Sequence, residues 1–137
     1  MFISTSGNLL ESAADVLVNA VNCKGVMGKG LAYSFKMRFP DMFADYVKSC
    51  RNGNLRIGTL HTYIEEDKII VNFPTKEDWR KPSELKYIKI GLGKLKDFIE
   101  ENKITTIAIP KLGCGLGGFK VGRSKKTDNK WIGIDKW

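Results

Sequence analysis

Short apolar runs alternate along the chain with segments whose apolar positions recur at helical spacing. Residues 31–39 and 83–102 show this helical spacing, and Pro40 predicts the start of a third helix that extends to residue 50. Five β-rich runs predict strands: MFIST (1–5), DVLVNAV (15–21), TLHTYIEE (59–66), KIIVNFP (68–74) and ITTIAIP (104–110). Strands that alternate with helices predict an α/β fold in which helices cover both faces of the sheet.

Three loops that follow predicted strands carry most of the chemically interesting residues. Their sequences are NCKGVMGKG (22–30), PTKEDWR (74–80) and LGCGLGG (112–118). In sheets covered by helices on both faces, ligands bind at the carboxyl ends of the strands. The sequence therefore predicts one site to which all three loops contribute.

The two glycine-rich loops are suited to a phosphate group. Glycines allow backbone N–H groups to converge on an anion, and the loop Gly25–Gly30 leads into a predicted helix N-terminus, which favours negative charge. Ordinary turns explain most isolated glycine loops, but two such loops at one sheet edge are stronger evidence. Neither GxxxxGK[ST] nor GxGxxG is present, which argues against an ordinary ATPase and a dinucleotide-dependent oxidoreductase.

Asn19 and Asn22 lie at the end of the predicted strand that precedes the first loop. An asparagine in this place is usually a turn or capping residue. The spacing also fits two separate roles, in which one side chain fixes the loop and the other points outward. An outward carboxamide offers the donor and the acceptor that a ribose diol needs.

Lys76, Trp79 and Arg80 follow the predicted strand 68–74. A lysine on a loop is usually a solvated surface group, but one held between glycine loops and apolar walls can serve as nucleophile or proton donor. Trp79 and Arg80 offer a stacking face and a phosphate ligand, the combination found in proteins that bind single-stranded nucleic acid. The alternative is that they cover the helix that follows.

Composition supports one domain with a basic surface. The chain has 137 residues, 42% hydrophobic and 28% charged, and 23 basic against 15 acidic side chains give a net charge of +8. This charge suits a polyanion, although a basic surface without such a partner fits equally well. Three separated cysteines and one histidine predict free thiols and no metal site. Without a membrane-length apolar run or secretory signal features, we expect a cytoplasmic monomer.

The motifs resemble the macrodomain family, and within it the DarG-type branch. The resemblance covers residues 1–119 and rests on VNxxGVMGKGxAxxFKxxFP, NFPTKxxWRxxS and IPKLGCGLGG. It implies a three-layer α/β/α sandwich with a mixed central sheet that binds ADP-ribose. DarG-type members are antitoxins that remove the ADP-ribose that the toxin DarT attaches to thymidine in single-stranded DNA. The implied partners are therefore ADP-ribose, ADP-ribosylated single-stranded DNA and a DarT-like toxin, and no cofactor is implied.

The resemblance also assigns site residues by position. Lys76 falls on the catalytic lysine of the DarG-like hydrolases. Apart from the resemblance, the side-chain types of Trp79 and Arg80 make these two residues the expected nucleic-acid contacts. The implied ADP-ribose ligands are Asn8 and Leu9 at the adenine, Asn22 at the distal ribose, Gly28, Lys29 and Gly30 at the diphosphate, Thr75 beside the lysine, and Gly113, Cys114, Gly115, Leu116, Gly117 and Gly118 around the other side of the diphosphate.

Three positions depart from the patterns of the family. Asn8 stands where most macrodomains have Asp, and Leu116 stands where DarG-like sequences commonly have Asn. Gly117 stands where a branch that cleaves ADP-ribose from glutamate has an Asp paired with the lysine. Lys76 would therefore act without this partner, either as a nucleophile at C1″ or as an acid. Two other functions remain open: hydrolysis of protein-linked or small ADP-ribose compounds, and ADP-ribose binding without catalysis.

Residues 120–137 do not match the expected end of a macrodomain. The segment KVGRSKKTDNKWIGIDKW is basic and lacks the helical period of the missing last helix. One interpretation is a basic tail that also contacts DNA. The other is a frameshifted or truncated gene, because one chosen set of codons for residues 120–131 encodes an amphipathic helix in another frame. The nucleotide sequence decides between the two.

Overall fold

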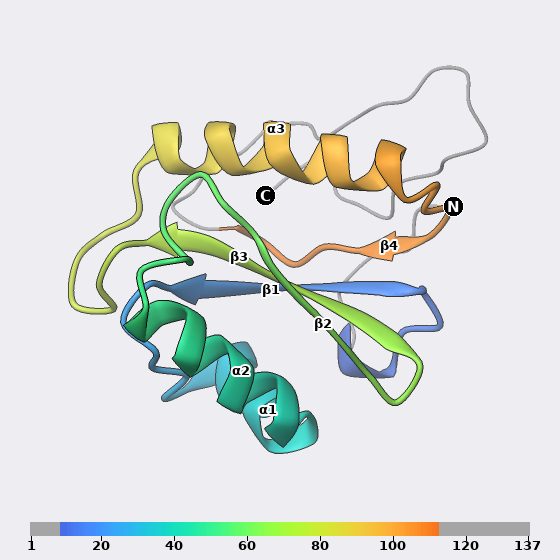
Figure 1. Cartoon of the computed structure of the whole chain (residues 1–137), viewed down its shortest axis with the longest axis horizontal. Coiled ribbons are helices and arrows are strands. Elements are labelled where there is room, and N and C mark those ends of the chain that lie inside the picture. Colours follow the sequence, from blue (N-terminus) through green and yellow to red (C-terminus); the bar gives the residue numbers. More distant parts are fainter. Residues whose placement is uncertain (1–8, 113–137) are drawn as a thin grey trace.

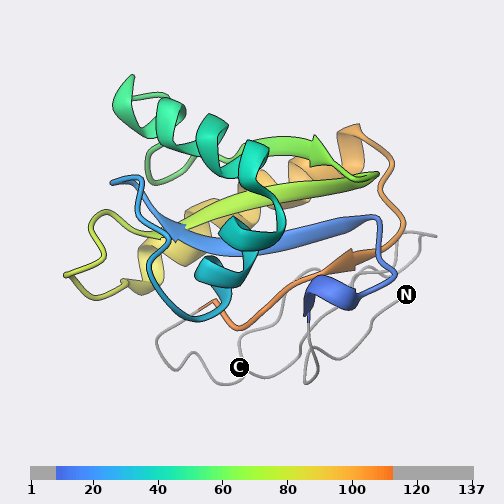
Figure 2. The same ribbon diagram turned by 90° about the horizontal axis from the view of Figure 1, so that it is seen from below.

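The structure, a computed structural model, describes residues 9–112 and shows a sheet between two layers of helices (Figure 1). The four strands lie in the order β2-β3-β1-β4. Helices α1 and α2 cover one face and α3 covers the other (Figures 1 and 2). The elements are η1 Leu9–Glu11, β1 Val16–Asn22, α1 Gly30–Arg38, α2 Pro40–Arg51, β2 His61–Glu65, β3 Lys68–Lys76, α3 Leu85–Glu101 and β4 Ile107–Ala108.

The sheet is mixed, as the resemblance implies. β1 lies parallel to β3, with Val16 opposite Ile69, and parallel to the short β4. β2 pairs antiparallel with β3 through a tight turn. Because β1 and β3 are covered on both faces, their sequences are nearly continuous apolar runs. Their carboxyl ends point to the same edge of the sheet, on the left in Figure 1.

Helix α3 packs on β3 through a narrow stripe of buried positions. Ile88, Gly91, Leu95 and Ile99 are three or four residues apart and all face the sheet. The ring of Phe73 occupies the space in front of Gly91, where a Cβ atom would lie 2.4 Å from the ring. The glycine is therefore required by the close approach of the helix to the strand, and not by its backbone conformation.

A row of buried polar side chains crosses the sheet on the face covered by α1 and α2. Asn19 Nδ2 donates to Asn72 Oδ1 at 3.1 Å, and Asn72 Nδ2 lies 2.9 Å from His61 Nδ1. The other ring nitrogen of His61 lies 2.7 Å from a carboxylate oxygen of Asp45 in α2. These contacts join β1, β3, β2 and α2 in one network. Buried polar groups need such partners, so the network fixes how the strands pair.

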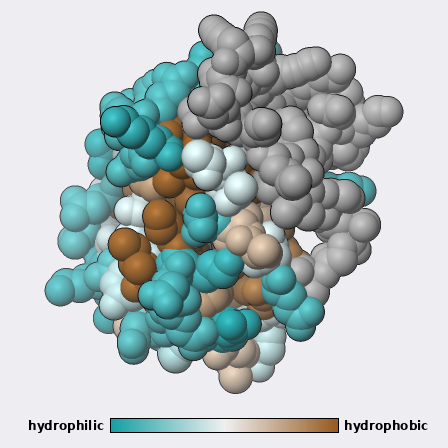
Figure 3. Space-filling view, turned by 90° about the vertical axis from the view of Figure 1, so that its right-hand side faces the viewer, coloured by the Kyte–Doolittle hydropathy of each residue, from teal (hydrophilic) through white to brown (hydrophobic). Residues whose placement is uncertain are grey.

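The structure confirms the predicted elements within the described residues. The main differences are that the strand predicted at 104–110 is reduced to Ile107–Ala108, and that the helix predicted from residue 83 begins at Leu85. The predicted strand 1–5 and the tail 120–137 lie outside the described residues. Within residues 9–112, no helix is long and apolar enough to cross a membrane. Figure 3 views the end where β1 and β3 begin, and apolar side chains lie there among hydrophilic ones.

Candidate functional site

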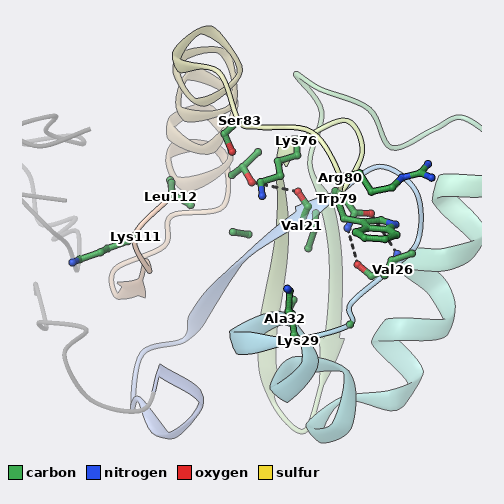
Figure 4. A pocket seen from close by; sticks show the side chains of 14 residues that line it. Val21, Val26, Lys29, Ala32, Lys76, Trp79, Arg80, Ser83, Lys111 and Leu112 are labelled. Atoms are coloured by element: carbon green, nitrogen blue, oxygen red, sulfur yellow. Dashed lines mark hydrogen bonds between the residues drawn. The ribbon is translucent and has the colours of Figure 1, made fainter. Parts of the chain in front are cut away.

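The loops that follow β1 and β3 meet at the carboxyl edge of the sheet. The backbone N–H of Cys23 donates to the carbonyl oxygen of Glu77 at 3.2 Å, which ties the two loops together. A cavity of about 810 Å³ opens beside them (Figure 4). Its described lining consists of Ala20, Val21, Asn22, Val26, Gly28, Lys29, Ala32, Thr75, Lys76, Trp79, Arg80, Ser83, Lys111 and Leu112.

An irregularity at the end of β3 places Lys76 in this cavity. Val21 pairs with Pro74, but the next residue, Asn22, pairs with Lys76, so Thr75 is an extra residue on β3. The Thr75 side chain is buried, and its hydroxyl donates to the Val21 carbonyl oxygen at 3.5 Å. Such a bulge bends the strand and changes the direction of the side chain that follows.

Lys76 is half-buried in the cavity wall. Among residues 9–112 it has no carboxylate partner. Figure 4 shows Lys76 and Ser83 on one side of the cavity, near the start of α3, with Trp79 and Arg80 on another side. An unpaired ammonium group inside a cavity is available to a ligand, so the geometry supports a functional role over a solvated surface role.

Asn22 holds the first loop in place. Its carboxamide oxygen accepts from the backbone N–H of Lys24 at 2.9 Å, and its Nδ2 donates to the Val26 carbonyl oxygen at 2.8 Å. The buried hydroxyl of Tyr46 donates to the Asn22 carbonyl oxygen at 2.8 Å, and it also lies 3.1 Å from the same carboxamide oxygen. The loop therefore uses the acceptor of Asn22, and one N–H group of its Nδ2 makes no hydrogen bond among the described residues.

The expected outward-pointing asparagine is absent from this edge of the sheet. Asn19 is fully buried in the polar network, and Asn22 uses its oxygen within the loop. Neither side chain therefore offers a free donor together with a free acceptor. The reason is that the backbone N–H groups of the loop need an acceptor themselves. A contact of Asn22 with a ribose stays a prediction and would use its remaining N–H group.

The start of α1 forms the floor of the cavity. Gly28 and Lys29 line it, and Lys29 is the N-cap of the helix without a side-chain hydrogen bond to it. Gly30 adopts φ of +63°, a conformation in which a side chain is strained. The first N–H groups of α1 are thus left without a side-chain cap, which suits an anionic ligand at this place.

The charged side chains in the described lining of the cavity are all positive. Lys29, Lys76, Arg80 and Lys111 contribute to its wall, and none of the described lining residues is acidic. A concave surface lined by one sign of charge attracts ligands of the opposite sign. The site is therefore built for an anion.

The two described cysteines do not offer a nucleophile. Burial, with smaller contributions from Cys50 and Glu77, raises the pKa of Cys23 to about 11. Burial also raises the pKa of Cys50. Both thiols therefore stay protonated at neutral pH and are poor nucleophiles. Within residues 9–112 there is also no group of three side chains that could hold a metal ion.

The loop residues after Lys76 form a compact cluster at the rim. The Asp78 carboxylate accepts from the Arg80 guanidinium at 3.0 and 2.8 Å, and the Arg80 guanidinium lies 5.2 Å from the centre of the Trp79 ring. These hydrogen bonds hold the pKa of Asp78 well below its usual range, so the carboxylate stays charged.

Most of the predicted site residues that lie within residues 9–112 come together in the structure. Asn22, Gly28, Lys29, Thr75, Lys76, Trp79 and Arg80 all line the cavity. Gly30, which directly follows Lys29, is not among the lining residues. Leu9 does not line the cavity either, because it is 5% exposed and packs into the hydrophobic core, so its predicted contact with adenine has no support from this geometry. Asn8, Gly113, Cys114, Gly115, Leu116, Gly117 and Gly118 lie outside the described residues.

Sequence reasoning missed several residues of the wall. Ser83 and Lys111 are the polar ones, and the apolar ones are Ala20, Val21, Val26, Ala32 and Leu112. Lys111 directly follows a predicted strand, and the carboxyl ends of parallel strands share one edge, so its position was a usable signal. Ser83 gave no comparable signal because its place depends on the path of the loop.

Comparisons with known proteins agree with this fold. The DNA ADP-ribosyl glycohydrolase of Mycobacterium tuberculosis is 48% identical over 118 residues, which is 83% of this chain and 34% of that protein. The chain thus spans about a third of the length of this relative. The solved macrodomain of M. tuberculosis DarG is 47% identical, with a TM-score of 0.79 over 88% of this chain and 82% of that one.

A third match is the structure of Thermosipho africanus DarTG in complex with ADP-ribose. It is 35% identical, with a TM-score of 0.74 over 82% of this chain and 33% of that one. A family model described as Macro domain matches residues 18–127. With most of its residues matched by this family model, the chain belongs to the Macro domain family.

Proposed function

We propose that this chain binds ADP-ribose and removes it from thymidine in single-stranded DNA. The observation that carries the proposal is the position of Lys76. It lines a cationic cavity beside an exposed tryptophan and arginine, and it has no carboxylate partner among residues 9–112. The similarity to DNA ADP-ribosyl glycohydrolases and to a DarTG structure with ADP-ribose supports the choice of ligand and substrate.

The positive charge of the cavity fits the diphosphate of ADP-ribose. Lys29 and the first N–H groups of α1 would bind the phosphates, and the remaining N–H of Asn22 would contact the distal ribose. The loop is already fixed by Asn22 and Tyr46, so binding orders few further groups. A fixed diphosphate also fixes C1″ of the ribose next to Lys76, and such positioning supplies a large part of the rate.

Hydrolysis breaks the bond between C1″ and the thymine nitrogen. The electron pair of that bond leaves with the base, the hydroxyl of a water molecule goes to C1″, and a proton goes to the base. Lys76 would act in one of two ways: as a proton donor toward the leaving base, or as a nucleophile whose covalent adduct water then releases. No acidic residue lines the described cavity, so Lys76 would act without a carboxylate there.

The test compares two substrates and two variants. We expect the wild-type chain to release ADP-ribose from thymidine-ADP-ribosylated single-stranded DNA faster than from ADP-ribosylated glutamate in a protein. In Lys76→Ala, ADP-ribose binding measured by calorimetry should persist, while release should fall by about 100-fold or more, the contribution of a positioned acid or base. Lys96→Ala removes an exposed lysine of α3 and serves as the control.

Three outcomes would contradict parts of the proposal. Release at the wild-type rate by Lys76→Ala would refute the role of the lysine. Faster release from the protein substrate would indicate a protein ADP-ribosyl hydrolase. Binding of ADP-ribose without release from either substrate would indicate a reader. We also propose a DarT-like toxin as the source of the modified DNA, because the Thermosipho africanus relative is named as a fusion of a DNA ADP-ribosyl transferase with the glycohydrolase.

A further inference from the structure

The side chain of Trp79 is more exposed than a purely structural role would explain. The residue is 52% exposed although it lies only three residues after the end of β3, a strand of the central sheet. A tryptophan that only covered the start of α3 would be largely buried, so the structure argues against that alternative. Large aromatic side chains left open next to a cavity are typical of binding surfaces.

Asp78 and Arg80 hold the indole in a defined environment. Asp78 is only 6% exposed and accepts three hydrogen bonds from Arg80: the backbone N–H at 2.9 Å, Nε at 3.0 Å and Nη2 at 2.8 Å. The guanidinium group, fixed in this way, lies 5.2 Å from the centre of the Trp79 ring. The arrangement is therefore set before any ligand arrives.

We propose that Asp78 is a positioning residue: it fixes Arg80 beside the Trp79 ring, so that the exposed face of the indole stacks on a nucleobase next to the ADP-ribosylated nucleotide. The inference rests on the proposed function and specifies its substrate as a strand of several nucleotides. The modified nucleotide itself would lie at Lys76, three residues earlier in the chain.

The chemistry of the cluster selects a nucleic acid strand. Every nucleobase has a π-face, so stacking on tryptophan tolerates any sequence. Asp78 occupies Nε and one N–H of Nη2, so three N–H groups of Arg80 remain, on a side chain that is 65% exposed. Guanidinium N–H groups of this kind bind the phosphate oxygens of a backbone. A nucleic acid strand has one base and one phosphate in every nucleotide. A ring that stacks on a base beside a guanidinium that binds a phosphate matches this pattern.

The test is the preference for a strand over a single nucleotide. The substrates are an ADP-ribosylated thymidine mononucleotide and an ADP-ribosylated single-stranded oligonucleotide. We expect Trp79→Ala and Asp78→Ala each to lower the ratio of kcat/KM for the oligonucleotide to that for the mononucleotide by about tenfold, the effect of one lost base stack. The change should appear in KM for the oligonucleotide. Trp79→Phe, which keeps an aromatic face, should recover most of the ratio.

A second measurement follows the stacking directly. The fluorescence of Trp79 is the difference between the emission of the wild type and that of Trp79→Phe. Unmodified oligothymidylate should quench this fluorescence. In Asp78→Ala, half of the quenching should require an about tenfold higher concentration of oligothymidylate. Thermal unfolding of each variant shows whether it is folded.

The outcomes separate the two proposals. An unchanged ratio in Trp79→Ala, or no quenching by oligothymidylate, overturns the stacking role. A lowered ratio in Trp79→Ala with an unchanged ratio in folded Asp78→Ala overturns the role of Asp78. If the wild type cleaves neither substrate, the proposed function fails, while the fluorescence titration still decides whether the indole stacks on a base.

Discussion

The contact between Gly91 and Phe73 gives a quantitative test of how α3 is seated on the sheet. A Cβ atom at Gly91 would lie 2.4, 2.6 and 3.0 Å from three carbon atoms of the Phe73 ring. Carbon atoms are in favourable contact at about 3.5–4.0 Å, so the ring or the helix would have to move by roughly 1 Å. The ring is fully buried, so it has no open space on the surface into which to move.

The expected magnitude follows from two opposing effects. Overpacking of a buried site costs about 1–3 kcal/mol, and this contact is at the severe end. Alanine is better than glycine inside a helix by about 1 kcal/mol. Gly91→Ala should therefore lower the free energy of unfolding by about 2 kcal/mol, which corresponds to roughly 8 °C in Tm for a domain of this size.

Gly93 in the same helix is the matched control. A Cβ atom there would meet nothing within 4 Å, so Gly93→Ala should raise the free energy of unfolding by about 1 kcal/mol. Because the helix effect is the same in both variants, the difference between them, about 3 kcal/mol, isolates the contact with the ring. Phe73→Leu in the Gly91→Ala background should recover part of the loss.

Urea unfolding of the two single variants and the double variant measures these differences. The reasoning would be refuted if Gly91→Ala were as stable as Gly93→Ala, because the helix would then lie farther from the strand than the structure shows. A full loss in the double variant, with no recovery, would show that the ring is not the obstacle.

Two further variants test the buried hydrogen bonds. Tyr46→Phe removes the donor to Asn22, so it should lower the free energy of unfolding by about 1 kcal/mol and weaken ADP-ribose binding. Tyr63→Phe serves as the control. Equal binding of ADP-ribose by both variants would show that the Tyr46 hydroxyl does not hold the loop. Asn72→Leu removes a hydrogen-bond partner of His61 and of Asn19 and should lower the free energy of unfolding by on the order of 3 kcal/mol. Urea unfolding measures this change, and an unchanged midpoint would contradict the role of the network.

The sequence predicts the elements of the fold well because burial leaves a direct mark on it. β1 and β3 are covered on both faces, so they appear as apolar runs, and the spacing of Ile88, Leu95 and Ile99 marks the buried face of α3. The loops at the carboxyl ends of the strands follow from the order of the elements. For this reason the sequence alone predicts that Lys76 lies at the carboxyl edge of the sheet.

The details of the site depend on contacts that no local pattern records. The bulge at Thr75 is visible only in the pairing of β3 with β1. The role of Asn22 depends on Tyr46, which lies 24 residues away in the chain. Leu9 was expected at the ligand from its place in a motif, but it is apolar and packs into the core. Such features are set by tertiary packing, which competes with any local preference.

The arrangement distributes three tasks over separate parts of the sheet edge. Asn22 and Tyr46 fix the loop before α1, where charge and backbone N–H groups suit a diphosphate. The bulge in β3 sets the position of Lys76, for which we propose the catalytic role. The described hydrogen bonds of the Asp78 carboxylate all come from Arg80, two residues away in the same loop. Because none of the described hydrogen bonds links this cluster to the side chain of Lys76, variants of it should change substrate preference and leave the chemistry at C1″ in place.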